Sequence, residues 1–326
     1  MARAVVIGSM GLLLCGGVLS VCVDKFALSS VDSYVHKTRN SRAIKLESHN
    51  FNLLDDYIAV DVTRANVTQL CEGMIKNFPR LETLALINVN LSQIEPGAFE
   101  NTPKLKGLSL SVNRLTRIEN GIFNKIPTLR VIYLTRNAIE TIEDGAFSEM
   151  PNLKVVHLDH NKIVELTGNI FFGSRKISFV DFSHNSIKEI DAKSFDDLRP
   201  GPAIKKLNIL LKKNLITRVD KAALEGLSTP VDLHLEVNQI YLTSDIMHGV
   251  REGSEVYLNG NNIECIPDDV IDEVETKRKT LHIKGNPLNC ECMKVLENRW
   301  NEDITNVGEL YFESTLPCSA FPELFL

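Results

Sequence analysis

An asparagine that recurs every 24 residues is the feature that most constrains the fold of this chain. Four segments align on it without gaps, and they read LSLSVNRLTRI, IYLTRNAIETI, VHLDHNKIVEL and VDFSHNSIKEI. The series continues toward the C-terminus with steps of 29, 24, 23 and 25 residues, and its members are Asn113, Asn137, Asn161, Asn185, Asn214, Asn238, Asn261 and Asn286. So regular a repeat predicts a coil whose successive turns share one structure.

Two further patterns run in the same register. Apolar residues alternate just before each asparagine, as at Leu108 and Leu110, which predicts a short strand with one buried face. Such strands would stack in parallel, about 4.8 Å apart. A phenylalanine also recurs every 24 residues and should form a stack on the outer side of the coil, its members being Phe99, Phe123, Phe147, Phe171 and Phe195.

The recurring asparagines are best explained by structure. After each strand the chain must turn, and the turn would leave buried backbone groups without hydrogen-bond partners. An asparagine amide is both donor and acceptor, so it can satisfy these groups and link one turn to the next. We therefore predict a structural ladder and no ligand role for these side chains.

The pattern L-x-L-x-x-N-x-L with a 24-residue period resembles the extracellular leucine-rich-repeat family in its typical subclass, from about Ile58 to Pro287. The resemblance implies an α/β solenoid, a horseshoe with a parallel β-sheet on its concave face, which usually binds the ligand. About nine to ten repeats would occupy residues 58–284. Ala65 and Val89 stand where the first ladder asparagines should be, and an insertion containing Pro200 predicts a local loop.

The first residues resemble a secretory signal peptide. One arginine precedes an apolar stretch with four glycines, and small residues follow at its end. We expect residues 1–20 to be removed, with cleavage after Ser20 or after Cys22, and residues 21–57 to form an N-terminal cap. A retained membrane anchor is the alternative, although the apolar stretch is short for a span.

The mature chain is expected to be secreted and extracellular. After the N-terminal segment the sequence contains no run of about 20 apolar residues, so we predict no membrane span in the mature chain. The formal net charge of −6 argues against nucleic acid as the main partner. The expected partner is an extracellular protein ligand, with a glycan-bearing ligand as the alternative.

Residues 285–326 resemble the cysteine-flanked C-terminal cap of the same family, which has four cysteines paired first to third and second to fourth. The resemblance implies that Cys290 pairs with Cys318 and leaves Cys292 over, because the fourth cysteine is absent. Cys265 lies one repeat earlier and is a possible partner for Cys292. Near the other end, Cys71 can pair with Cys22 only if the signal peptide is cut after Ser20.

Two N-x-S/T sequons occur, at Asn66 and Asn90, again 24 residues apart. In a secreted chain both are reasonable glycosylation acceptors, and two glycans would project from neighbouring turns. They would direct a protein partner toward the middle of the coil. The alternative is that either sequon stays unoccupied.

The candidate binding surface is formed by the strand residues that alternate with the buried ones. Aromatic and charged groups on a rigid sheet make good anchors for a partner. The residues we expect to contact a ligand are Tyr133, His157, Asp159, Asp181, His234 and Tyr257.

Five of the eight histidines are expected on this face, namely His157, His160, His184, His234 and His282. His160 and His184 share a register in adjacent repeats, as do His157 and Asp181, which predicts Cα separations of roughly 5 Å. Such a group could hold zinc or change charge between pH 5 and 8. Polar residues at these positions also face water without any further role, and we predict no metal site and no cofactor.

The sequence shows no catalytic motif. It has no G-x-S-x-G, no H-E-x-x-H, no phosphate-binding loop and no C-x-x-C pair, and an open face does not exclude water as catalysis usually requires. The sequence therefore predicts a non-catalytic binding protein, plausible in extracellular recognition or innate immunity. Two alternatives stay open: a truncated ectodomain of an adhesion or signalling receptor, and a secreted inhibitor of an enzyme.

Overall fold

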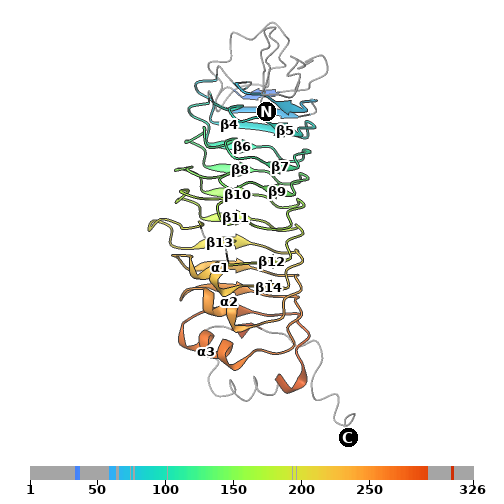
Figure 1. The fold of residues 1–326 in the computed structure, drawn as a ribbon, viewed down its shortest axis with the longest axis vertical. Coiled ribbons are helices and arrows are strands. Elements are labelled where there is room, and N and C mark those ends of the chain that lie inside the picture. Colours follow the sequence, from blue (N-terminus) through green and yellow to red (C-terminus); the bar gives the residue numbers. More distant parts are fainter. Residues whose placement is uncertain are drawn as a thin grey trace. The chain divides into compact units, whose positions relative to one another are not determined.

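The computed structural model describes residues 59–63, 66–73, 75, 78–100, 102–192, 194–195 and 197–292, and the backbone of 34–36 and 310–311. The chain divides into two compact units. Unit 1 comprises residues 1–163 and 169–177, and unit 2 comprises residues 164–168 and 178–326. Each unit is a stretch of coil built from parallel strands (Figure 1). Within the described part of the chain, no helix has the length and apolar character needed to cross a bilayer.

Unit 1 contains one row of strands along one side of the coil. The strands are β1 (Tyr34–His36), β2 (Ala59–Thr63), β4 (Thr83–Ile87), β6 (Gly107–Ser109), β8 (Val131–Tyr133) and β10 (Val155–His157). β1 pairs with β2 antiparallel, and every later neighbour is parallel. The alternating pattern has the predicted effect: Leu84, Leu108, Ile132 and Val156 are buried, and their strand neighbours are not.

Unit 2 continues the same design. Its row consists of β11 (Phe179–Asp181), β13 (Leu207–Leu210), β15 (Val231–His234), β16 (Glu255–Tyr257), β17 (Thr280–His282) and β18 (Leu310–Tyr311), all parallel. Phe179 pairs with Asn208, a separation of 29 residues. The inserted residues therefore form a loop away from the strands, as predicted, and leave the strand register intact.

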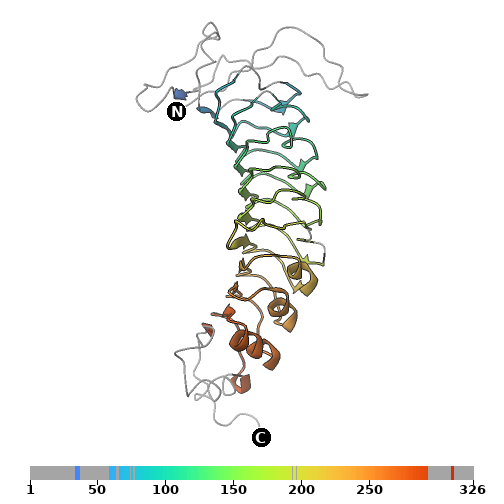
Figure 2. The same cartoon turned by 90° about the vertical axis from the view of Figure 1, so that its left-hand side faces the viewer.

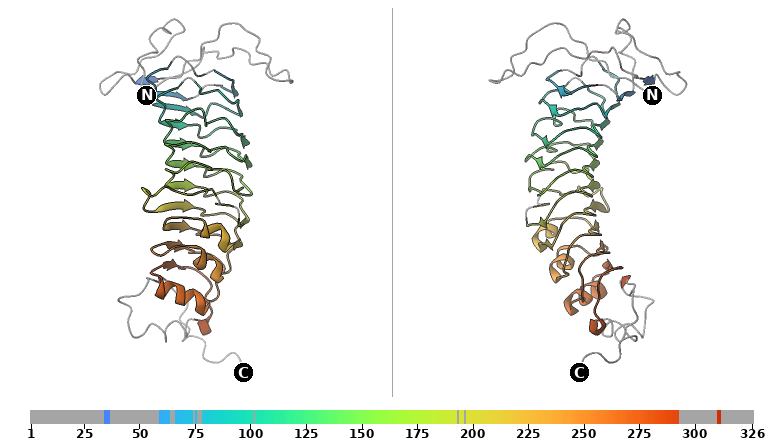
Figure 3. Two further views of the ribbon diagram at one scale, coloured as in Figure 1. Left: turned by 60° about the vertical axis from the view of Figure 1, so that its left-hand side comes forward. Right: turned by 90° about the vertical axis from the view of Figure 1, so that its right-hand side faces the viewer.

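The opposite side of the coil is made of short elements. Two-residue strands pair there: β3 (Gln69–Leu70) with β5 (Gln93–Ile94), β7 (Arg117–Ile118) with β9 (Thr141–Ile142), and β12 (Glu189–Ile190) with β14 (Arg218–Val219). Unit 2 adds the helices α1 (Lys221–Glu225), α2 (Ser244–Gly249) and α3 (Asp268–Thr276). Figures 2 and 3 show these helices on the side of unit 2 that faces away from its strands.

The helices follow from local sequence. Asp220 caps α1, because its side chain accepts a hydrogen bond of 2.9 Å from the backbone N–H of Ala222. In α3 the apolar residues Val270, Ile271 and Val274 recur at helical spacing and are buried. Each helix thus turns one apolar face into the coil.

The recurring phenylalanines form the outer core of unit 1. Ring centroids of Phe99 and Phe123 lie 6.4 Å apart, those of Phe123 and Phe147 5.6 Å, and those of Phe147 and Phe171 5.7 Å, all in stacked orientation. Phe195 is buried in unit 2. Because each ring covers the face of the next, the stack joins consecutive turns by apolar contact.

Within each unit, ladder asparagines join successive turns by hydrogen bonds. Asn161 shows the arrangement: its Nδ2 donates to the carbonyls of Leu158 and Leu134 at 2.9 and 3.0 Å, and its Oδ1 accepts from the N–H of Ile139 at 3.1 Å. Leu134 and Ile139 belong to the preceding turn. Asn113, where the ladder begins, donates in the same way and accepts from the N–H groups of Val89 and Leu91.

The residue before each ladder asparagine adopts a left-handed backbone conformation. Its φ is positive throughout, at Val112, Arg136, His160, His184, Lys213, Val237, Gly260 and Gly285. His160 and His184 therefore lie in the turns that follow the strands, and the expectation that they belong to the strand surface is corrected. The turn geometry places them there, because a left-handed residue ends the alternation of side chains along a strand.

The cysteines near the C-terminus follow one of the two predicted pairings. Cys265 and Cys292 form a disulfide with a Cα separation of 5.3 Å. Cys290 is an exposed free thiol, which differs from the predicted bond to Cys318, a residue outside the described part of the chain. The positions of Cys265 and Cys292 in adjacent turns bring them within bonding range. Cys71 is disulfide-bonded, and its predicted partner Cys22 lies outside the described residues.

The predicted fold class is confirmed as a solenoid of parallel strands with 24-residue turns. The predicted signal peptide (1–20) and most of the two caps (21–57 and 285–326) lie outside the described residues, so these boundaries stay predictions.

The ladder makes a prediction about stability. Asn161→Ala should lower the free energy of unfolding by about 3 kcal/mol, because it removes a buried amide that bonds the Leu134 and Leu158 carbonyls and the Ile139 N–H. Asn152→Ala is the matched control, since it removes a solvent-facing amide that bonds Pro127, and should cost about 0.5 kcal/mol or less. Urea denaturation of both variants measures the difference, and equal losses would contradict a structural ladder.

Candidate ligand-binding face

The strand face consists of the strand side chains that alternate with the buried ones. The pairing of neighbouring strands aligns one such side chain from each strand into a row, which we call the central row of each unit. In unit 1 the central row runs through Ala85, Ser109, Tyr133 and His157. In unit 2 it runs through Asp181, Leu210, His234, Tyr257 and His282. Five of the six predicted contact residues therefore occupy central rows, and Asp159 follows its row by two residues.

In unit 1 the central row contains one pair of stacked rings. The centroids of Tyr133 and His157 lie 4.8 Å apart, and the ring planes differ by 11°. Tyr133 keeps 42% of its surface exposed, whereas Ile132 beside it is buried completely. An exposed aromatic ring held by a packed neighbour is a suitable anchor for a partner.

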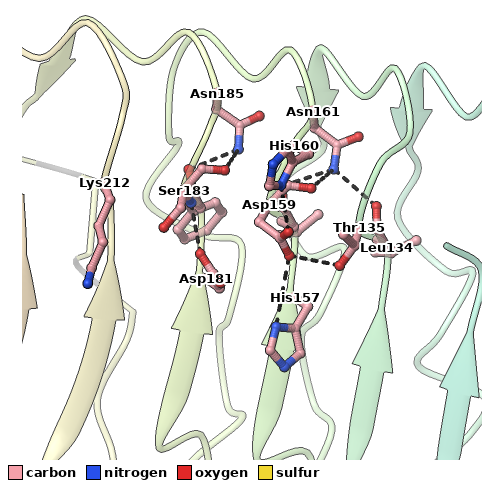
Figure 4. A network of polar contacts seen from close by, with 12 residues as sticks. Leu134, Thr135, His157, Asp159, His160, Asn161, Asp181, Ser183, Asn185 and Lys212 are labelled. Carbon is pink, nitrogen blue, oxygen red and sulfur yellow. Dashed lines mark hydrogen bonds and ion pairs between the residues drawn. The ribbon is translucent and has the colours of Figure 1, made fainter. Parts of the chain in front are cut away.

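Asp159 organises the polar groups next to this pair (Figure 4). Its Oδ1 accepts a hydrogen bond from Thr135 Oγ1 at 2.7 Å and lies 3.9 Å from His157 Nδ1. Its Oδ2 lies 2.9 Å from His160 Nδ1. The carboxylate thus orients Thr135 and His160, and both of its oxygens are already engaged.

In unit 2 the central row contains three stacked rings. Tyr257 lies between His234 and His282, with centroid distances of 4.2 Å on each side and interplanar angles of 7° and 4°. Both faces of the Tyr257 ring are therefore covered by the chain itself. A partner that approaches this row meets ring edges and the polar atoms attached to them.

Charged groups on these strands and directly beside them form ion pairs around the rings. Lys206 Nζ lies 2.5 Å from an Asp232 oxygen and 2.7 Å from Glu255 Oε1. Glu236 Oε1 lies 3.0 Å from both His234 Nδ1 and Lys212 Nζ. The acidic side chains in this part of unit 2 are thus paired across neighbouring strands.

The surroundings shift the pKa of several groups in this part of unit 2. Hydrogen bonds from Lys206 and Tyr257 lower the pKa of the Glu255 carboxyl. Burial alone would raise the pKa of Glu236, but hydrogen bonds from His234, from its own backbone and from Lys212 outweigh burial and lower it. Burial strongly raises the pKa of the Tyr257 hydroxyl, and its 2.6 Å hydrogen bond to Glu255 raises it further. Glu255 therefore stays ionised and Tyr257 protonated around neutral pH.

Asp181 lies on β11 of unit 2, where its Oδ1 accepts a hydrogen bond of 2.9 Å from the backbone N–H of Ser183 (Figure 4). This contact closes a small turn at the end of the strand. The predicted neighbour His157 belongs to unit 1, so their proximity stays a prediction.

The two sequons are in direct contact. Asn90 Nδ2 donates a hydrogen bond of 3.2 Å to Asn66 Oδ1 on the exposed edge of unit 1. A glycan is attached through the amide nitrogen, which retains one N–H after the attachment. Both asparagines can therefore carry glycans while this contact persists.

Sequence reasoning did not include His282, Glu255 and Lys206 among the contact residues. The signal for His282 and Glu255 was available, because counting residues back from the ladder asparagines gives the register of His282 beside Tyr257 and of Glu255 beside Asp232. Lys206 could not be found in this way. It precedes β13 after the irregular insertion, and its pairing with Glu255, 49 residues later, depends on how its long side chain lies.

Comparison with known proteins agrees with this geometry. A leucine-rich-repeat family model matches residues 59–115, 103–163 and 151–200. The structure of mouse RP105 in complex with MD-1 is similar at a TM-score of 0.62 and 20% identity over 78% of this chain and 42% of that one. A TLR13–ssRNA13 complex is similar at a TM-score of 0.50 and 18% identity over 78% of this chain and 43% of that one. No curated protein matches.

Residues 59–200 are thus leucine-rich repeats, as predicted, and the coil continues with the same strand register through β17. The chain spans less than half the length of these two solved structures. At such low identity the similarity shows the shared fold.

The three-ring stack makes a prediction about titration. In an absorbance titration, Tyr257→Phe should match the wild type up to about pH 11, because a phenol with a raised pKa does not ionise at the ordinary tyrosine pKa near 10. In a Glu255→Gln background the difference between the two should move to lower pH, because one cause of the raised pKa has been removed. A difference that already appears near pH 10 in the wild-type background would contradict the described environment of Tyr257.

Proposed function

We propose that this chain is a secreted, non-catalytic leucine-rich-repeat protein that binds an extracellular protein ligand through its strand face. The observation that carries the proposal is the central row of Tyr133 and His157, because a rigid strand presents an exposed aromatic ring there. The repeat family, the signal-like first residues, the Cys265–Cys292 disulfide and the two sequons support an extracellular setting.

The arrangement favours binding over chemistry. Carboxylates beside both ring stacks are engaged by lysine, histidine or hydroxyl partners, as Asp159 and Glu255 show. Catalysis requires groups held ready for a substrate in a site that excludes water. A paired and open surface of this kind supports recognition of another molecule.

A protein ligand is also the partner type named for one of the two similar structures, in which RP105 is complexed with MD-1. TLR13 is complexed there with ssRNA13, so RNA is a conceivable partner for this fold. The net charge of −6 of this chain disfavours RNA, because neutralising phosphates requires an excess of lysine and arginine.

A second candidate is that the chain is part of a longer receptor ectodomain. The short coverage of both similar structures, 42% and 43% of their chains, supports this candidate. Transcript sequence downstream of Leu326 would test it, since a membrane span in the same reading frame would decide in its favour.

Secretion and glycosylation make a testable prediction. Expressed in eukaryotic cells, the full chain should appear in the medium without residues 1–20, carry glycans at Asn66 and Asn90, and lose mass after enzymatic deglycosylation. Intact-mass and peptide mapping measure all three. Retention of an unglycosylated chain in the cytosol would contradict the proposal.

Affinity capture tests the binding face. The purified mature chain should retain specific proteins from extracellular fluid, and the double variant Tyr133→Ala, His157→Ala should lose them, because alanine removes the stacked pair. A loss of about tenfold or more in affinity is expected for an anchor residue. Tyr241→Ala is the matched control, since this tyrosine is 61% exposed but lies outside the strands. Full retention by the double variant would overturn the proposed face.

A further inference from the structure

One face of the Tyr133 ring is uncovered, and this face indicates which chemical group of a partner binds there. The ring of His157 stacks on one face of Tyr133 at 4.8 Å. On the other side, strand register places Ser109 opposite Tyr133. A serine side chain is too short to cover a six-membered ring, and this explains why Tyr133 stays 42% exposed inside a row of side chains.

The two strands that precede β8 carry only uncharged, non-aromatic residues on the strand face. β4 and β6 contribute no ring, no long side chain and no charge to the strand face, and its residues there are Thr83, Ala85, Ile87, Gly107, Ser109 and Ser111. Gly107 fits this pattern, because a Cβ added to it would lie 3.3 Å from the Thr83 side chain. Space beside the Tyr133 ring is therefore left by the residues of the two preceding turns.

Unit 2 shows what kind of group completes such a row. There the chain supplies a ring at three consecutive positions, and Tyr257 is covered on both faces at 4.2 Å by His234 and His282. In unit 1 the same row supplies only two rings, and Ser109 stands where the third would lie. Tyr133 is thus the end of a stack that lacks its next member.

The charges and hydrogen-bonding groups beside Tyr133 restrict the chemical class of the group that could stack on its open face. A charged group placed beside Tyr133 would have no opposite charge on β4 or β6, since the strand-face residues of both strands are neutral, and Asp159 lies on the His157 side. Ser109 Oγ and Ser111 Oγ lie 3.5 Å apart, at the limit of a hydrogen bond, so both hydroxyls retain capacity for a ligand. An aromatic ring with one polar atom matches both conditions.

We propose that the open face of Tyr133 is the docking position for a tyrosine or tryptophan side chain of the protein ligand. Its ring stacks on Tyr133 over Ser109 and extends the row by one member, and its hydroxyl or indole N–H bonds to a serine hydroxyl. This inference rests on the proposed function and adds the chemical class of the anchor. Tyr257, with both faces covered, has no such role.

Small probes test the position without the natural ligand. Saturation-transfer NMR on the full glycosylated chain would use N-acetyl-tyrosinamide and N-acetyl-tryptophanamide, with N-acetyl-argininamide and a methyl glycoside as comparisons. The aromatic amides should bind in the millimolar range, as expected for a single stacked group. Ser109→Tyr should weaken this binding about tenfold by filling the position with the chain's own ring, and Tyr133→Ala should do the same by removing the surface.

Two control variants distinguish specific probe binding at Tyr133 from non-specific binding to exposed aromatic residues and from loss of the fold. Tyr241→Ala should leave probe binding unchanged, because it removes an exposed tyrosine outside the strands. Ser109→Ala keeps the face of the Tyr133 ring open and should retain probe binding. A loss of probe binding in Ser109→Tyr but not in Ser109→Ala therefore shows that the introduced ring blocks the site. The melting temperature of each variant should stay close to the wild type.

Each outcome decides the matter. No aromatic binding in the wild type, or equal binding in Ser109→Tyr, would overturn the proposal. Preferred binding of the arginine amide would identify a cation site instead, and preferred binding of the glycoside a carbohydrate site. The proposed function fails separately, through the capture experiment: Tyr133-dependent capture without probe binding would leave the binding face standing and remove only the aromatic anchor.

Discussion

The structure depends on the hydrogen bonds that the ladder asparagines make to backbone groups of two successive turns. A coil with 24 residues per turn buries carbonyl and N–H groups that no strand or helix can satisfy. One amide side chain satisfies three of them, as Asn161 does for Leu158, Leu134 and Ile139. Because the same bonds recur in the next turn, strand register is maintained, and the positions of all strand-face side chains follow from it.

The fold was predictable from sequence because its information is repeated. An alternating apolar pattern, an asparagine and a phenylalanine recur together, so each turn gives independent support to the same structure. Positions that depend on register, such as Tyr133 beside His157, could be placed in the same way. The left-handed residues were not anticipated. His160 looked like a strand residue, because nothing in its immediate sequence marks the backbone φ that turns it out of the strand.

Interactions between long side chains were harder to predict from sequence than the positions of those residues along the strands. Register shows that His234, Tyr257 and His282 are neighbours, but only coordinates show that the rings lie parallel at 4.2 Å and that Tyr257 is thereby closed to a ligand. The sequence alone ranked Tyr133 and Tyr257 as equivalent anchors. They differ because Tyr257 has a ring on each side and Tyr133 has a serine on one, a distinction that depends on the neighbouring turns and on the rotamers chosen there.

The insertion before β13 has a consequence for how such a surface can change over time. Its extra residues lengthen one turn to 29 without disturbing the pairing of Phe179 with Asn208. Extra length is therefore accommodated outside the strands, where it leaves the register of the strand-face side chains unchanged. New specificities could accumulate one side chain at a time across the turns, with little epistasis between the surface that selects a partner and the interior that holds the coil together.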